Sequence, residues 1–394
     1  MAVPVAYPFV EVFITPPPTP IAQRSPGVIA IVGKTPAGAD GGLTPANVPV
    51  EIVTMDDAVT SFAKKNPDGS VAATTLYNSI ALAFLQDPKP SKIYGVRVAA
   101  DNYAAALASL EGVGDVTFVS LANDATLGAP AAGATPPTGL QALKAHVESM
   151  SSQGAKRIGV AMVNPATAKS PTYAADVIAA LTAPNTLKSD VSRMIMVAAR
   201  GATGDVATAA MAAIAGFSPQ TSIVLKKIRG ISIPNEQRFS PSEIIALSNA
   251  NIIPIIHPAL IVGESLHFGE GRLFTTDASL LFVDLVRVID DVDFKLQAGL
   301  VGMIGDSRIT KAGLTQVKAR ITAILDPLVG SAELDDYHVE IPILNMLQIP
   351  ESARTAAEEL QISDARANRV IDVYVTIVYG PAIHRLRVNL AVKF

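Results

Sequence analysis

Residues 27–33 read GVIAIVG, a short and continuous apolar run between two glycines. Such a run predicts a strand that is buried on both faces, as the strands of parallel sheets are. Further strands are predicted at residues 92–98, 116–121, 157–163 and 193–198. Alanine-rich helices are predicted between the later strands, at residues 140–150, 173–181 and 206–215. This alternation predicts a mainly parallel sheet covered by helices, and therefore a mixed α/β fold.

The rest of the chain adds further elements around this alternation. Helices are also predicted at residues 55–65, 72–85 and 311–328, and a strand or strand pair at residues 252–262. Ser240, Pro241 and Glu243 occupy the N-cap, first and third positions of another predicted helix. No internal repeat is present, so the second half is not a copy of the first.

The segment 282–300 predicts a long amphipathic helix. One stripe of this helix is apolar and consists of Leu285, Val288, Ile289, Val292 and Leu296. The helix also carries the densest acidic cluster of the chain, Asp290, Asp291 and Asp293. Arg287 and Lys295 lie within pairing distance of these carboxylates on a helix. We therefore predict a solvated, salt-bridged helix face here and no metal site.

Residues 370–394 read VIDVYVTIVYGPAIHRLRVNLAVKF and predict two β-strands joined at Gly380-Pro381. In the first strand the odd-numbered residues from Ile371 to Tyr379 point to one side. In the last strand one apolar face consists of Leu386, Val388, Leu390, Val392 and Phe394. The opposite face carries Arg385, Arg387, Asn389 and Lys393. Because a two-stranded ribbon alone is marginal in water, it must pack on the chain's own sheet or against another subunit.

The other end of the chain favours the second alternative. Alternating apolar residues are also found there, at Val3, Val5, Tyr7 and Phe9. Pro4 and Pro8 restrict this segment to an edge strand, and the proline-rich residues 15–20 form an extended spacer. Two such arms predict strand exchange between neighbouring copies of the chain.

Composition agrees with extensive contacts between subunits. The 394 residues carry 17% charged side chains and a net charge of −4, and their mean hydropathy is +0.36. Cysteine is absent, which excludes disulfides and thiolate chemistry. Without a basic run interleaved with aromatic residues, no direct binding of nucleic acid is predicted. No membrane span or signal peptide is evident, so we expect synthesis in the cytoplasm.

Two features resemble chemical motifs but do not complete them. Gly33-Lys34-Thr35 follows a strand, yet a phosphate-binding loop would need a glycine at Val28, and the chain continues into Pro36. The histidines are His146, His257, His267, His338 and His384, and none is three or four residues from another. We interpret His257 as a satisfied core histidine. No catalytic residue, bound cofactor or metal is therefore predicted.

Several blocks, in their order, resemble the contractile tail sheath proteins of phages, phage-tail-like bacteriocins and related injection systems. Near the start, Ser25-Pro26-Gly27 leads into GVIAIVG. Further blocks are RFSPSEIIALSNANIIPII (238–256), FVDLVRVIDDVDFKLQAGLVGMIGD (282–306), DDYHV (335–339) and the closing residues 374–394. The resemblance is weak over residues 100–215.

The resemblance implies a structural protein and not an enzyme. Its implied domains are an N-terminal arm (1–25), a core in two parts (26–100 and 218–369), a variable outward-facing insertion (101–217) and a C-terminal ribbon arm (370–394). Such subunits form stacked rings around an inner tail tube, linked by strand exchange between arms, and contract to drive the tube through a cell envelope. Their partners are other copies, the tube, the baseplate and the tail terminator, in a virion tail or injection particle assembled in the host cytoplasm.

Residues carried over from this resemblance are of two kinds. Those expected to exchange between subunits are Val3, Val5, Tyr7, Phe9, Leu386, Val388, Leu390, Val392 and Phe394. Those expected to face the tube are Lys311, Lys318 and Arg320. Two alternatives remain open at this level. The alternating strands of residues 92–215 also fit a doubly wound α/β enzyme, and the two arms also fit another self-assembling shell or tube subunit.

Overall fold

A computed structural model describes residues 25, 27–36, 38–99, 101–133, 135–182, 187–191, 193–263 and 265–384. The described residues divide into two compact units. The smaller unit contains Lys295–Ile324 and Val339–Tyr374, and the larger unit contains the rest. The predicted boundaries at residues 100 and 217 both fall within the larger unit.

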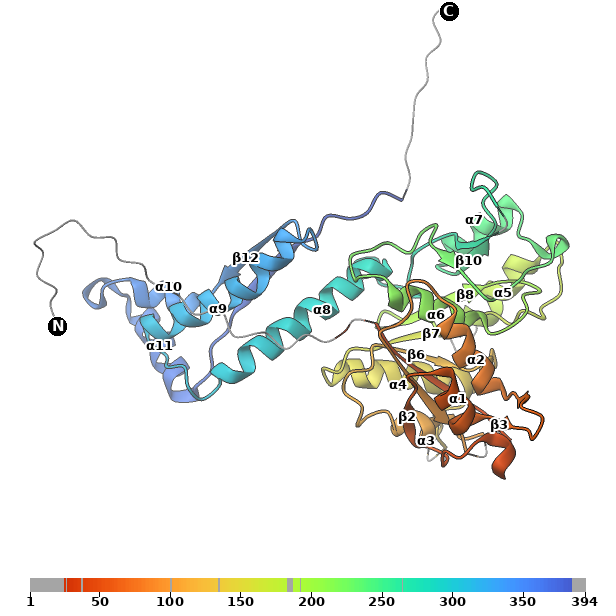
Figure 1. Cartoon of the computed structure of the whole chain (residues 1–394). Helices are drawn as coiled ribbons and strands as arrows, with labels where there is room; N and C mark the ends of the chain where they lie inside the picture. Colours follow the sequence, from red (N-terminus) through yellow and green to blue (C-terminus); the bar gives the residue numbers. More distant parts are fainter. Residues whose placement is uncertain are drawn as a thin grey trace, which may run out of the picture. The chain divides into compact units, whose positions relative to one another are not determined.

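One sheet organises the larger unit (Figure 1). Among the described residues its strand order is β2-β5-β1-β6-β7-β8-β10-β11-β9. The parallel part consists of β5 (Lys92–Arg97), β1 (Val28–Gly33), β6 (Phe118–Leu121), β7 (Ile158–Met162), β8 (Met194–Ala198) and β10 (Ile253–Ile256). Short antiparallel strands β2 (Pro49–Glu51), β11 (Leu266–Phe268) and β9 (Lys227–Ile228) complete its edges. The predicted mainly parallel sheet is confirmed.

Helices cover both faces of this sheet. They are α1 (Met55–Phe62), α2 (Thr75–Phe84), α3 (Tyr103–Ala108), α4 (Gly139–Ser152), α5 (Tyr173–Thr182), α6 (Val206–Gly216) and α7 (Pro241–Asn249). Ile29 and Ile31 of β1 share one core with α2 and α6. Val28, Ala30 and Val32 share the other core with α3, α4 and α5. Every residue of β1 is buried, which explains its uninterrupted apolar sequence.

Local sequence signals fixed several helix ends. Ser240 caps α7 in a reciprocal capping box with Glu243, as predicted. The helices predicted at residues 55–65 and 72–85 are shorter than expected, because β3 (Lys64–Lys65) pairs there with β4 (Val71–Ala72). The turn between these strands contains Gly69 at φ +82°, a left-handed conformation that glycine adopts readily.

The long helix α8 (Val283–Leu300) corrects one prediction. Its apolar Val288 and Val292 are buried, but so are Asp284, Arg287 and Asp291, each 9% exposed or less. The predicted solvated face is therefore wrong for this part of the helix. The physical reason is that the larger unit supplies polar partners for the charged side chains.

Those partners include backbone carbonyls, one arginine and the hydroxyl of Tyr379, which donates to Asp284. The Arg287 guanidinium donates to the carbonyl oxygens of Phe217 at 2.6 Å and Ser218 at 3.3 Å. Its guanidinium carbon also lies 5.5 Å from the ring centre of Phe118. Asp290 pairs with Arg193. A buried polar stripe, and not a surface network of salt bridges, therefore holds this half of α8.

The smaller unit has its own apolar core. Its residues come from α9 (Lys311–Gly330, which continues beyond this unit), α10 (Pro342–Gln348), α11 (Ala356–Asn368) and nearby segments. The buried side chains of this core are Leu314, Ile341, Leu344, Leu347 and Ile362. A separate two-stranded sheet consists of β12 (Asp336–Glu340) and β13 (Tyr374–Val378), and most residues of both strands belong to the larger unit. Throughout the described residues, no helix is both long and apolar enough to cross a membrane.

Candidate functional site

The two-stranded sheet of β12 and β13 is the strongest candidate for an interaction site. From Ile371 to Gly380 the side chains alternate strictly between half-buried and exposed. Val375 and Ile377 of β13 are half-buried, whereas Tyr374 and Val378 are 58% and 45% exposed. The predicted parity of this strand is confirmed, because its odd-numbered residues form the covered face.

The pairing partner of β13 was not predicted. β13 pairs with β12, and the amide of Asp335 donates to the carbonyl of Val378 at 2.8 Å beside this pairing. The last strand, expected to follow Gly380-Pro381, lies outside the described residues from position 385 onward. The same is true of every exchange residue named from the sequence, in both arms.

Within the described residues, no third strand joins this small sheet. Each of its two strands therefore presents one row of backbone donors and acceptors to which another strand could bind. Ile371 and Val373, just before β13, pack on the core of the smaller unit. A half-covered apolar face beside an open edge is the geometry that accepts an added strand.

A groove of about 390 Å³ lies at the start of β13. It is lined by α10, α11 and the residues that lead into β13. Its charged side chains are two carboxylates, Asp364 on α11 and Asp372 before β13, and both are exposed. The groove therefore favours a basic ligand over an acidic one.

The three basic residues predicted to face a tube do not share one environment. Lys311 and Lys318 are exposed on α9, and their seven-residue spacing places them on the same helix face. Arg320 is half-buried, and its Nε donates to the carbonyl oxygen of Gly299 at 3.2 Å. Arg320 thus has a structural contact within its own unit, while Lys311 and Lys318 are exposed.

The carboxyl ends of the parallel strands are where a doubly wound enzyme would bind its ligand. Lys34, directly after β1, lies 2.7 Å from Asp101 and 4.0 Å from Asp124. Tyr103 donates to Asp124 at 2.6 Å. The chain after Lys34 enters a short 3-10 helix at Gly38–Gly41 and not an α-helix. These side chains form structural pairs at this edge of the sheet.

The arginine that follows β8 is also structural. Arg200 has a fully buried side chain and donates to Glu243 at 2.5 Å. Its guanidinium lies 4.5 Å from the ring centre of Tyr173 and 5.0 Å from that of Phe239. These contacts join α5 and α7 to the end of the sheet. In the described part of the chain, no group of three or more possible metal ligands comes together.

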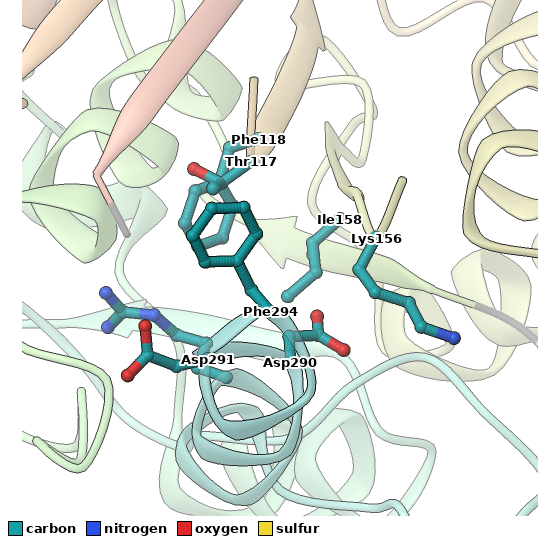
Figure 2. A pocket seen from close by; sticks show the side chains of 8 residues that line it. Thr117, Phe118, Lys156, Ile158, Asp290, Asp291 and Phe294 are labelled. Carbon is teal, nitrogen blue, oxygen red and sulfur yellow. The ribbon is translucent and has the colours of Figure 1, made fainter. Parts of the chain in front are cut away.

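A small cavity beside α8 is too small for a substrate. Its volume is about 30 Å³, which is room for about one water molecule. Figure 2 shows Phe294 beside Phe118, with Asp290 and Asp291 on opposite sides of the helix. The cavity is a packing defect next to the buried polar stripe.

His257 differs from the prediction of a satisfied core histidine. It is half-buried, and its Nε2 is buried without a hydrogen-bond partner. The reason is that β10 ends at Ile256 and the chain then turns toward the surface, where Leu260 and Val262 are fully or almost fully exposed. His146 is the histidine that meets a partner in the core, at 2.8 Å from Arg157.

His146 should make stability depend on pH. Burial, together with the neighbouring Arg157 charge, lowers its pKa from 6.5 to about 4. Between these values the unfolded chain binds a proton that the folded chain does not, so stability falls as the pH falls from 6.5 to about 4. We expect a loss of about 2–4 kcal/mol across this range. Denaturation of the native chain and of the His146→Asn variant at several pH values measures this loss. The same dependence of the free energy of unfolding on pH in both proteins would contradict the prediction.

Comparison with solved structures places this fold among contractile sheath proteins. The anti-feeding prophage helical sheath in its contracted state matches with a TM-score of 0.61 and 14% identity, covering 99% of both chains. The contracted sheath complex of an extracellular contractile injection system matches with a TM-score of 0.63 and 13% identity, covering 99% of this chain and 98% of that one. A sheath tail protein from Listeria innocua matches with a TM-score of 0.51 and 13% identity over 92% and 96% of the chains.

The sequence comparisons add no closer relative. No family model matches the chain, and no curated protein does. The likeness is therefore one of fold, and the sheath fold expected from the sequence resemblance is confirmed. It extends over nearly the full length of both chains.

Proposed function

We propose that this protein is the subunit of a contractile sheath, acting as a structural protein without catalytic activity. The observation that carries the proposal is the full-length match of its fold to sheaths described in their contracted state. The open edges of the β12–β13 sheet supply the surface that such an assembly needs. A hollow of about 510 Å³ lies at the carboxyl ends of β6, β7 and β8, but the charged side chain that lines it, Asp124, already accepts a hydrogen bond from Tyr103, which gives no support to the enzyme alternative.

We further propose that the C-terminal segment of one copy adds a strand to the small sheet of another. An added strand keeps the face parity of the sheet, so its apolar residues would continue the half-buried face of Val375 and Ile377. Its basic residues would then continue the exposed face, near the acidic groove. The residues proposed to pack are Leu386, Val388, Leu390, Val392 and Phe394. Those proposed to meet Asp364 and Asp372 are Arg385, Arg387 and Lys393.

The N-terminal segment would be the second donor. Its alternating residues are Val3, Val5, Tyr7 and Phe9. Because Glu11 is the charged side chain among its first dozen residues, this segment has no charge attraction to the acidic groove. It would therefore pair at the other open edge, that of β12. Each subunit would then give two strands and receive two.

The remaining partners follow from the same proposal. Other copies, an inner tube, a baseplate and a tail terminator would contact the sheath, in a virion tail or injection particle assembled in a host cytoplasm. Lys311 and Lys318 are exposed and would face the tube. Arg320 would have to give up its hydrogen bond to the carbonyl oxygen of Gly299 in order to contact the tube. Residues 101–217 would face outward.

Negative-stain microscopy of the purified chain tests this function. We expect hollow tubes from the full chain. A variant that lacks residues 385–394 should stay monomeric and folded, because it keeps every described element but loses the donated strand. Circular dichroism provides the control for folding. Monodisperse monomers of the full chain across a wide concentration range would contradict the proposal.

A further inference from the structure

The chain that follows β13 is attached to its own larger unit at two points. The first is Tyr379, whose hydroxyl donates to Asp284 at 2.7 Å. Asp284 lies in the first turn of α8 and is 3% exposed, so its carboxylate also faces the positive end of the helix dipole. Burial and this hydrogen bond raise the pKa of Tyr379, which keeps the phenol protonated as a donor.

The second point is His384. Its Nε2 lies 2.8 Å from the hydroxyl of Ser222, and its ring meets Phe282 edge to face at 5.2 Å between centres. Nδ1 lies 4.0 Å from the carboxylate of Glu270. Each nitrogen of the imidazole has a polar partner, and an aromatic ring packs against the imidazole. These contacts define a specific binding site for the His384 side chain.

Between the two points the segment makes little contact. Pro381 and Ala382 are exposed, and Ile383 is 81% exposed. The attachment therefore depends on two side chains and not on a continuous apolar face. A hydrogen bond to a carboxylate, together with a neutral one, favours the attached state by about 30- to 2,000-fold. The segment is therefore mostly attached in the absence of load, and a force applied to the C-terminal segment could detach it.

We propose that Tyr379 and His384 form a latch that fixes the point at which the C-terminal segment leaves its subunit. This inference rests on the proposed sheath function. With the latch closed, residues 385–394 are the length available to another copy, a span of about 33 Å. Opening the latch adds residues 379–384, or about 20 Å. Opening of the latch would thus lengthen the segment that connects two subunits when they rotate against each other.

Pulsed electron spin resonance on the full chain tests the latch directly. The chain lacks cysteine, so Ala179→Cys on α5 and Ala382→Cys between the two points would be its sole labelling sites. Both alanines are exposed, and a nitroxide on each reports their distance distribution. To keep the labelled chain monomeric, Val388→Pro and Leu390→Pro remove strand donors from the last segment.

We expect a narrow distance distribution in this background and a broad one after Tyr379→Phe with His384→Ala. The matched control is Tyr374→Phe with His338→Ala, which changes an exposed tyrosine and an exposed histidine and should leave the distribution narrow. A broad distribution before any latch substitution, or a narrow one after it, would overturn the latch. Neither result depends on tube formation, so failure of the latch and failure of the sheath function are separate outcomes.

Discussion

Replacing Arg287 by alanine should lower the free energy of unfolding of the larger unit by about 3–5 kcal/mol. Arg287 is 4% exposed, and burial lowers its pKa from 12.5 to about 10. Two carbonyl oxygens, those of Phe217 and Ser218, lose their donor in the variant. The nearby carboxylates of Asp284 and Asp291 lose their compensating charge at the same time, which is the costly outcome for a buried ion.

Urea denaturation followed by circular dichroism measures this loss. The matched control is Arg229→Ala in the same unit, because the ion pair of Arg229 with Asp87 is exposed, at 43% and 67%. An exposed pair contributes about 0–1 kcal/mol, so the control should unfold close to the native chain. Equal losses in the two variants would show that the buried stripe of α8 has no special role in stability.

The parallel sheet was predictable because a fully buried strand appears in the sequence as a continuous apolar run. β1, β7 and β8 were each located to within about two residues, since a strand covered on both faces must be apolar throughout. The helix that begins at Pro241 was equally clear, because its capping box is contained within four residues. Both signals are local, and neither needs knowledge of a distant contact.

The buried polar stripe of α8 was not predictable in this way. Asp284, Arg287 and Asp291 have the spacing of a surface ion-pair network, and the sequence offers no sign that they are covered. The carbonyls that receive Arg287 are those of Phe217 and Ser218, about 70 positions away. A charged residue gains its burial from tertiary structure, so a periodicity argument assigns it to solvent.

The candidate site was predicted in part. Alternation gave the correct face parity of β13, because side-chain direction in a strand follows from residue number alone. It did not give β12 as the partner, although Tyr337 and Val339 alternate there with exposed residues. Strand pairing depends on which segments meet in space. The same limit applies to the latch, whose partners Ser222 and Asp284 are distant in sequence.

Reversing the charge of the groove should strongly weaken assembly. In the variant Asp364→Lys with Asp372→Lys, two attractions between the groove and the basic face of the donated strand become repulsions. Juxtaposed like charges cost several kcal/mol, and each 1.4 kcal/mol is a factor of ten. We therefore expect the protein concentration needed for tubes to rise at least about 100-fold, measured by sedimentation and negative-stain microscopy.

The reciprocal exchange distinguishes strand recognition from a general effect of charge. Arg385→Glu, Arg387→Glu and Lys393→Glu should block assembly alone and restore it when combined with the groove variant, because opposite charges then face each other again. Asp306→Lys with Glu351→Lys makes the same charge change at exposed positions outside the groove and should leave tubes intact. Assembly of the groove variant at native concentrations would show that the acidic groove does not recognise the donated strand. Failure of the combined variant to assemble would show that charge alone does not determine how the donated strand binds to the groove.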